Sequence, residues 1–222
     1  MDPSFWHQRW QSSQIGFHLP APNPRLVEHW PALGVPLEHE VFVPLCGKSV
    51  DMRWLAARGH RVRGVELSPL AAEAFFAEAG ETPTRTPDGA HLRHEAGPIR
   101  ILEGDVFAVE QALDAIYDRA ALIALPPELR ARYAAHLTRL ARPGARMLLV
   151  TLSWPEGLRQ GPPFSVPEAL VEGYYADTWE LTRVDEADLK AAEPARFADV
   201  PWAKETTFHL VRRPVAQGGV AR

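Results

Sequence analysis

The chain has 222 residues, of which 46% are hydrophobic, and its 24 Lys and Arg against 28 Asp and Glu give a formal net charge of −4. This mild acidity argues against a nucleic-acid-binding protein, which needs a basic face, and we expect no nucleic-acid partner. The single cysteine, Cys46, excludes an internal disulfide and fits a reducing cytoplasm. The sequence has neither a signal-peptide pattern nor an apolar run of the roughly 20 residues of a membrane span, so we expect a cytoplasmic protein without a membrane partner.

The first 38 residues show no strand pattern, yet they hold enough aromatic side chains for a small core. We therefore expect residues 1–38 to form an irregular N-terminal arm that folds over another part of the molecule. The aromatic residues are Phe5, Trp6, Trp10, Phe17 and Trp30.

From residue 40 onward, short apolar runs alternate with helical segments, which indicates an α/β fold with a doubly wound, mostly parallel sheet in one domain of residues 1–222. Strands are predicted at residues 40–45, 61–65, 91–94, 99–103, 114–118, 146–151, 178–184 and 206–212. Helices are predicted at residues 50–58, 69–79, 127–141 and about 168–175. The predicted irregular segments are a loop at 81–89, a stiff loop at 161–167 and a frayed tail at 214–222.

Helix boundaries carry recognisable capping residues. Ser49 and Ser68 are predicted N-caps, the latter followed by a first-turn proline. Gly59 lies where a glycine commonly ends a helix, here the one predicted at residues 50–58. Pro143-Gly144 is expected to end the helix predicted at residues 127–141.

Polar residues follow the predicted strands at their carboxyl ends, where ligands bind in doubly wound sheets. Glu66 ends a strand about 20 residues after the first strand–turn–helix, the position at which an acid binds ribose hydroxyls in dinucleotide and adenosyl sites. The alternative is an exposed strand-end acid. Asp105 is placed to accept a hydrogen bond from an adenine amine, or simply to form a turn. Arg119 suits an anionic substrate, with Asp118 as a plain ion-pair partner in the alternative interpretation.

The first turn reads PLCGKS at residues 44–49 and contains one glycine, Gly47. A single glycine makes a poor cradle for a pyrophosphate but lets the chain approach a methionine moiety, which favours an adenosylmethionine ligand over a dinucleotide. A phosphate-binding loop of the Walker A type is excluded because Phe42 stands where its first glycine belongs. Cys46 is interpreted as a small buried hydrophobe, and the scattered histidines predict no metal site.

Aromatic residues of the arm have two possible roles. Trp6, Trp10 and Phe17 present faces that attract a cation such as a sulfonium and that stack on flat rings. Ordinary packing of the arm onto the domain explains them equally well.

Several motifs in chain order resemble the thiopurine S-methyltransferase family, in its bacterial branch. They are SFWHQRW at 4–10, IGFH at 15–18, VPLCGKSVD at 43–51, RGH at 58–60, GVELS at 64–68, YDRAALIALP at 117–126 and GPPFSVP at 161–167. The resemblance runs from Ser4 to about Pro167 and is loose beyond residue 178.

The resemblance implies a Rossmann-like class I methyltransferase fold with an N-terminal aromatic lid, a monomer, and methyl transfer from S-adenosylmethionine to the sulfur of aromatic and heterocyclic thiols. Bacterial members of the family are also associated with selenium and tellurium compounds. Phe17 matches an aromatic that faces the substrate, residues 161–167 resemble part of the site cover, and Arg196 has a loose counterpart near the C-terminal lid. The cofactor contacts implied by the resemblance are Trp10, Leu45, Glu66, Asp105, Val106 and Arg119.

The expected reaction is an in-line displacement on the sulfonium methyl. A thiolate is a strong nucleophile, so alignment and charge stabilisation matter more than general-base catalysis. In this hypothesis Arg119 is the catalytic residue, which stabilises the anionic thiolate or takes its proton through water, while Trp10 and Phe17 close over the reactants. The competing interpretations are a methyltransferase for another acceptor, a nucleotide-dependent oxidoreductase, which the single glycine disfavours, and a non-catalytic adenosyl-binding protein.

Overall fold

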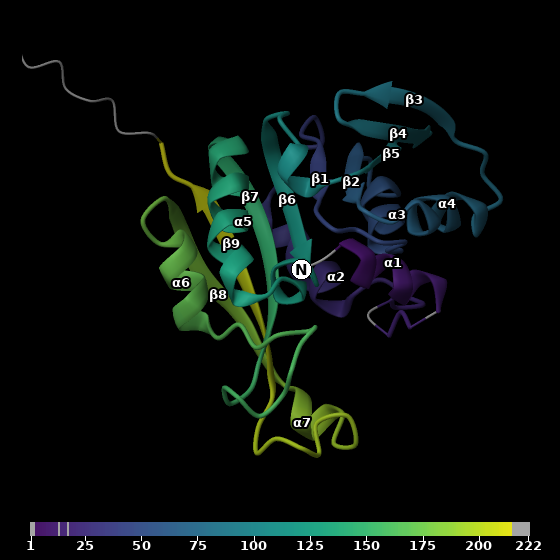
Figure 1. Cartoon of the computed structure of the whole chain (residues 1–222). Helices are drawn as coiled ribbons and strands as arrows, with labels where there is room; N and C mark the ends of the chain where they lie inside the picture. Colours follow the sequence, from purple (N-terminus) through teal and green to yellow (C-terminus); the bar gives the residue numbers. More distant parts are fainter. Residues whose placement is uncertain (1–2, 13, 17, 215–222) are drawn as a thin grey trace, which may run out of the picture.

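A nine-stranded sheet forms the centre of the protein, in a computed structural model that describes residues 3–12, 14–16 and 18–214 (Figure 1). The strand order is β3-β4-β5-β2-β1-β6-β7-β9-β8. The strands are β1 (Val41–Val43), β2 (Val62–Glu66), β3 (Thr84–Asp88), β4 (His91–Ala96), β5 (Ile99–Glu103), β6 (Leu113–Arg119), β7 (Ala141–Ser153), β8 (Trp179–Asp188) and β9 (Lys204–Arg212).

The five central strands, from β5 to β7, are parallel, and an antiparallel hairpin flanks them on each side. On one side β4 pairs with β5 and carries β3 as the edge strand, and on the other β9 pairs with β7 and carries β8. The order reverses at β1, which lies between β2 and β6. This is the predicted doubly wound sheet, and the reversal fixes the place where ligands bind, beyond the carboxyl ends of β1 and its neighbours.

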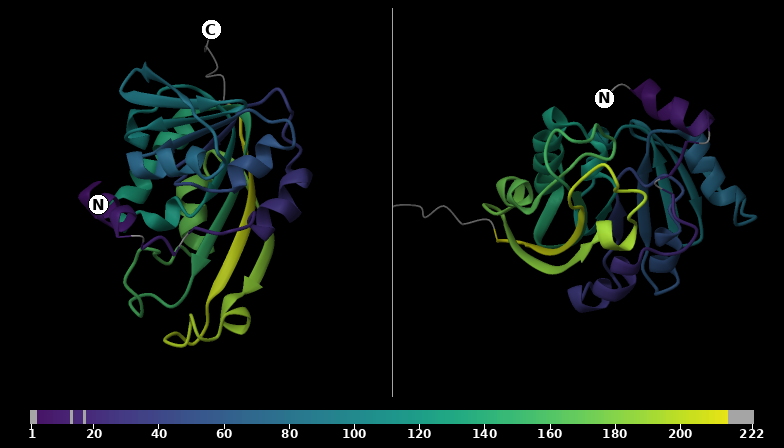
Figure 2. Two further views of the ribbon diagram at one scale, coloured as in Figure 1. Left: turned by 90° about the vertical axis from the view of Figure 1, so that its right-hand side faces the viewer. Right: turned by 90° about the horizontal axis from the view of Figure 1, so that it is seen from below.

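Helices cover both faces of the sheet (Figures 1 and 2). They are α1 (Pro3–Gln11), α2 (Pro24–Leu33), α3 (Asp51–Ala56), α4 (Pro69–Ala77), α5 (Pro127–Leu140), α6 (Glu168–Tyr175) and α7 (Leu189–Ala192), with short 3-10 turns η1 (Val106–Ala108) and η2 (Leu122–Ala124). Successive residues of a strand point to opposite faces, so the strands feed two separate cores. Phe42 packs with the residues of α5 and α6, whereas Val41 and Val43 pack with those of α2, α3 and α4.

The N-terminal arm is helical, so the prediction of an irregular segment was wrong. The second helix has clear end signals, because the Asn23 side chain accepts a hydrogen bond from the Arg25 N–H, Pro24 occupies the first turn and Gly34 ends the helix with φ 65°. Leu26, Trp30 and Leu33 form the buried face of this helix. The aromatic content of the segment concealed these caps in the sequence pattern.

Two other boundaries differ from the predicted ones. Residues 84–88 form the edge strand β3 inside the predicted loop, and their side chains are mostly exposed, so no apolar alternation marks them. The Pro143-Gly144 pair lies within β7 rather than ending α5, which already ends at Leu140. Gly144 adopts φ 81°, and the pairing of β6 with β7 shifts register near this point.

Candidate functional site

The turn after β1 is the sharpest backbone feature at the carboxyl edge of the sheet. Leu45 has φ 46° and Gly47 φ 52°, so two of three successive residues adopt the left-handed conformation that a residue with a Cβ seldom takes. The Cys46 N–H donates to the Val65 carbonyl at 3.0 Å, which ties the turn to β2. Backbone held in this way by its surroundings is common where a ligand is clamped.

The carboxylate of Glu66, at the end of β2, is the predicted ribose acid. One oxygen accepts the Gly47 N–H at 2.9 Å and the other accepts the Ser68 N–H at 2.7 Å. Burial raises the pKa of this carboxyl, and the N–H groups of Ser68, Gly47 and Leu67 oppose the rise. A carboxylate has about four lone-pair sites, so each oxygen keeps capacity for a further donor, such as a hydroxyl group.

Ser68 follows Glu66 and is the N-cap residue of α4, at the predicted position. Its hydroxyl makes no capping bond, and its N–H donates to the Glu66 carboxylate. The hydroxyl is buried and has no hydrogen-bond partner among the residues that the structure describes. A buried hydroxyl without a partner is costly, so it is a candidate donor for a group bound beside Glu66.

The Asp105–Val106 turn lies after β5, the neighbour of β2. Asp105 is exposed, and its Oδ1 accepts the Phe107 N–H at 3.0 Å, so this carboxylate caps η1 and at the same time faces solvent. Val106 is buried. The main-chain carbonyl oxygen of Asp105 lies 3.0 Å from His91 Nε2. The main-chain carbonyl oxygen of Val106 lies 3.0 Å from His136 Nε2.

Asp118 and Arg119 end β6 and have different surroundings. Asp118 is fully buried and accepts hydrogen bonds from the Tyr133 hydroxyl at 2.7 Å and the Leu122 N–H at 3.2 Å, so it anchors the following turn. Burial raises the pKa of Asp118 to about 6. Arg119 is half-buried, and the next residue, Ala120, has φ 70°. The chain therefore turns sharply just beyond the guanidinium-bearing residue.

His18 is a site residue that the sequence did not reveal. Its pKa is lowered by burial first, then by the charge of Lys48, with a smaller contribution from Arg119. The charges of Lys48 and Arg119 thus both act on the imidazole of His18. The IGFH motif contains His18, but no pattern in the sequence separates it from the other histidines.

Helix α1 of the arm packs against α4 and reaches the β2–α4 turn (Figure 2). His7 Nε2 lies 3.3 Å from the Leu67 carbonyl oxygen, directly after Glu66. Trp10 is half-buried on the same helix. Phe17, the predicted substrate-facing aromatic, lies outside the described residues.

Asp51 is a second residue that sequence reasoning missed. It is buried at the start of α3 and accepts the Asn23 N–H at 2.7 Å and the Tyr117 hydroxyl at 2.9 Å. The Asp51 carboxylate thus joins the residue before α2, the start of α3 and β6. Nearby, Lys48 forms an ion pair with Glu78. The positive charge of Lys48 is therefore explained without a catalytic role.

The predicted cover loop at residues 161–167 is fastened to the carboxyl edge by hydrogen bonds. The Phe164 N–H donates to the Ile123 carbonyl at 2.7 Å. Arg130 of α5 is buried and donates to the carbonyls of Leu125 at 2.8 Å and Ser165 at 3.3 Å, so one side chain ties η2 to the loop.

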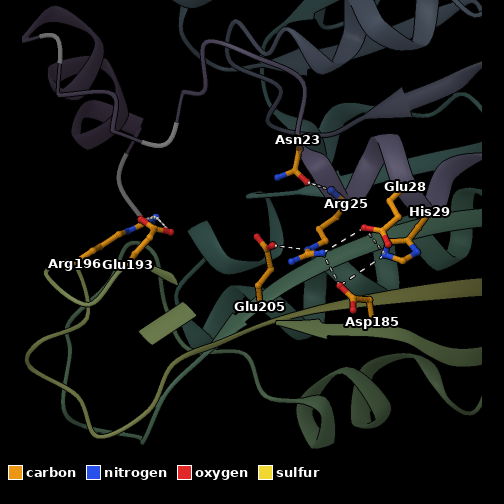
Figure 3. A network of polar contacts seen from close by, with 8 residues as sticks. All are labelled: Asn23, Arg25, Glu28, His29, Asp185, Glu193, Arg196 and Glu205. Atoms are coloured by element: carbon orange, nitrogen blue, oxygen red, sulfur yellow. Dashed lines mark hydrogen bonds and ion pairs between the residues drawn. The ribbon is translucent and has the colours of Figure 1, made fainter. Parts of the chain in front are cut away.

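Arg196, the loose family counterpart, lies between α7 and β9 and pairs with Glu193 at 3.0 Å (Figure 3). A separate network in the same figure joins α2 to the C-terminal hairpin, because Arg25 contacts Asp185 at 2.8 Å and Glu205 at 3.0 Å. The structure therefore fixes the second helix of the arm to the C-terminal hairpin.

Over the described part of the chain, no group of three metal-binding side chains comes together. No helix within residues 3–12, 14–16 and 18–214 is long and apolar enough to cross a membrane.

Comparison with known proteins identifies the family of the chain. The profile of the thiopurine S-methyltransferase (TPMT) family matches residues 1–213. A protein of Shewanella amazonensis named thiopurine S-methyltransferase is 45% identical over 219 residues, which cover 96% of this chain and 100% of the relative. One of the same name from Xanthomonas campestris pv. campestris is 44% identical over 217 residues, with the same coverage.

Solved structures share the fold at low sequence identity. The 1,6-didemethyltoxoflavin-N1-methyltransferase of Burkholderia thailandensis, solved with S-adenosylhomocysteine, has a TM-score of 0.62 and 18% identity over 96% of this chain and 87% of its own. The magnesium protoporphyrin IX methyltransferase of Synechocystis has a TM-score of 0.64 and 16% identity, covering 95% of this chain and 100% of its own. The sheet is thus that of class I methyltransferases.

Proposed function

The chain belongs to the thiopurine S-methyltransferase family of S-adenosylmethionine-dependent enzymes, and we propose that it methylates the sulfur of aromatic and heterocyclic thiols such as thiopurines. The observation that carries the proposed site is the Glu66 carboxylate, held by two N–H groups at the end of β2 beside a left-handed turn. The residues around it fit the cofactor, because the spare lone pairs of Glu66 and the unpartnered Ser68 hydroxyl match the donors and acceptors of a ribose.

We assign the cofactor to the carboxyl edge on both sides of β2. Glu66 takes the ribose hydroxyls, Asp105 and Val106 take the adenine, and the Leu45 main chain and Trp10 take the methionine end. Bound there, S-adenosylmethionine supplies a methyl group on a positively charged sulfur. An aromatic face such as that of Trp10 attracts such a cation by about 0.5–2 kcal/mol, and this attraction favours binding of the charged cofactor over its neutral product.

Arg119 is the proposed catalytic residue. A guanidinium stays charged at any working pH, and in a half-buried site its attraction for a thiolate is stronger than in water. Arg119 therefore holds the acceptor as its anion and aligns the sulfur for in-line attack. Phe17 is proposed to stack on the flat acceptor ring, and the loop at 161–167, fastened by Arg130, excludes water from it.

The arm is proposed to act as a lid over the ribose. His7 contacts the carbonyl next to Glu66, so an ordered α1 covers that corner of the site. The exchange of His7 for Ala is expected to raise the cofactor dissociation constant by about three- to tenfold, the range of one lost hydrogen bond. The control is Gln8→Ala on the exposed side of the same helix. Equal affinities of the two variants would exclude a lid that depends on this contact.

The test of the proposed function is a parallel transfer assay with methyl-labelled S-adenosylmethionine. We expect transfer to 6-mercaptopurine and loss of most of it in Arg119→Ala, with cofactor binding retained. Selenite and tellurite belong in the same panel, because soft selenium and tellurium nucleophiles need no positioned base either. Methylation of oxygen or nitrogen acceptors alone would indicate a different methyltransferase, and cofactor binding without transfer to any acceptor would indicate a non-catalytic binding protein. We further propose a cytoplasmic monomer, for which sedimentation velocity tests the oligomeric state.

A further inference from the structure

The turn that carries Asp105 and Val106 is short and needs outside support. It is a three-residue 3-10 helix after Gly104, and helices of this type have poor hydrogen-bond geometry and persist only in short pieces. Its own bonds run from the Ala108 N–H to the Asp105 carbonyl at 3.0 Å and from the Val109 N–H to the Val106 carbonyl at 3.2 Å. Both carbonyls have a second lone pair, and each of these is taken by a histidine.

His136, on α5, is fixed in one protonation state by its neighbours. Arg139, which can only donate, lies 3.2 Å from His136 Nδ1, so Nδ1 is the acceptor and the proton is on Nε2. That Nε2–H donates to the Val106 carbonyl at 3.0 Å. The ring also meets Phe107 edge to face at 5.7 Å, and the Arg132 guanidinium lies over the Phe107 ring at 3.9 Å from its centroid. Burial lowers the pKa of His136, in keeping with a neutral ring.

His91, on β4, holds the preceding carbonyl. Its Nε2 lies 3.0 Å from the Asp105 carbonyl oxygen, which can only accept, so the imidazole donates. The ring lies so close to Gly104 that a Cβ at that position would be 2.7 Å from His91 Cδ2. Gly104 also has φ 148°, and the absence of a side chain there allows both the backbone bend and the approach of the ring.

We propose that His91 and His136 are positioning residues that hold the Asp105–Val106 turn for the adenine of the cofactor. The turn offers an exposed carboxylate and, at its amino end, the Val106 N–H, which has no acceptor within the turn. This donor and acceptor pair matches the amino group and ring nitrogen on one edge of adenine. The histidines touch neither cofactor nor acceptor and act only through the turn. The inference rests on the adenine placement under the proposed function.

The first experiment measures S-adenosylhomocysteine affinity by calorimetry. His136→Phe keeps a ring against Phe107 but removes the hydrogen-bond donor to the Val106 carbonyl. We expect the dissociation constant to rise about three- to tenfold, the range of one hydrogen bond. His136→Gln places an amide donor at a similar reach and is expected to restore affinity to within twofold of the wild type. Thr138→Val, on the same helix, removes the bond from the Trp179 indole and is expected to lower the melting temperature without changing the affinity.

The second experiment asks whether the loss is specific to adenine. An analogue with a 6-oxo group in place of the adenine amine cannot donate to Asp105, so His136→Phe is expected to weaken this analogue less than S-adenosylhomocysteine. The KM for S-adenosylmethionine should rise while kcat at saturating cofactor stays unchanged. Equal weakening of both ligands, no weakening at all, or failure of Gln to rescue would overturn the proposal. His91→Phe and His91→Gln provide an independent pair if His136→Phe does not fold.

A separate variant distinguishes this proposal from the one it rests on. Asp105→Ala should weaken the binding of S-adenosylhomocysteine by about tenfold. It should also abolish the preference of the protein for adenine over the 6-oxo ring. If Asp105→Ala has no effect, the adenine placement itself is wrong. If Asp105→Ala weakens binding but neither histidine variant does, the placement stands and the role of the histidines is refuted.

Discussion

Asp118 is expected to make the stability of the protein depend on pH in the mildly acidic range. Its carboxyl is fully buried, and its pKa is about 6 in the folded protein against an ordinary value of 3.8. The folded state therefore binds the proton more tightly than the unfolded state. The corresponding stabilisation is complete below pH 3.8 and is lost as the pH rises through 6.

The magnitude follows from the two pKa values. A difference of about 2 units corresponds to about 3 kcal/mol in total, since one unit is about 1.4 kcal/mol. Between pH 5.0 and pH 7.5 the same values give a loss of about 1.4 kcal/mol. For a chain of this length, that is a fall in melting temperature of about 3–6 °C.

The assay compares Asp118→Asn with the wild type by chemical denaturation at several pH values from 5.0 to 7.5. The amide oxygen still accepts from the Leu122 N–H and the amide nitrogen faces the Tyr133 hydroxyl, so the fold is preserved while the titration is removed. We expect the difference in unfolding free energy between the two proteins to change by about 1.4 kcal/mol over this range. Asp114→Asn, on the same strand, is the control and should keep the wild-type dependence. Identical pH profiles for wild type and Asp118→Asn would refute the reasoning.

Three further predictions concern the site and its support. Glu66→Ala should weaken S-adenosylhomocysteine by about 10- to 100-fold in calorimetry, since hydrogen bonds to a charged group contribute about 1.5–3 kcal/mol, and unchanged affinity would contradict the ribose assignment. Gly64→Ala should lower the unfolding free energy by about 1–3 kcal/mol, because its Cβ would lie 2.5 Å from Cys46 Sγ, and a Cys46→Ala background should relieve part of the loss. Arg130→Met should raise the KM for the thiol more than the KM for the cofactor, because it frees the cover loop; equal changes in both would count against that role.

The position of Glu66 was predictable because it depends on the order of the elements in the sheet. Strand alternation located the carboxyl edge, and the acid about 20 residues after the first turn pointed to Glu66, which lies there with two N–H donors on its carboxylate. The single glycine of the first turn, Gly47, likewise favoured an adenosylmethionine ligand over a dinucleotide. What the sequence could not indicate is that Leu45 shares the left-handed conformation with Gly47, since a leucine has no preference for it.

The supporting residues were not predictable, because their partners are distant in the chain. Asp51 joins Asn23 to Tyr117, and each of these three is unremarkable within its own segment. His91 and His136 converge on neighbouring carbonyls from a strand and a helix that are 45 residues apart in sequence. Only the folded chain brings them together. The same holds for Asp118, which the sequence places next to Arg119 but which strand alternation directs toward the core.

These contacts divide the site into two parts with different freedom to change. On the proposed cofactor side, the Glu66 carboxylate accepts main-chain N–H groups, and the side chains of His91 and His136 hold the Asp105–Val106 turn, so the geometry depends on residues built into the sheet and α5. On the acceptor side, the cover loop is attached through one buried arginine and a few main-chain bonds, and its exposed residues can vary without disturbing the sheet. Substitutions in the loop at 161–167 should therefore change the choice of thiol while leaving cofactor affinity intact. An enzyme organised in this way can acquire new acceptors without rebuilding the part of the site that binds the methyl donor.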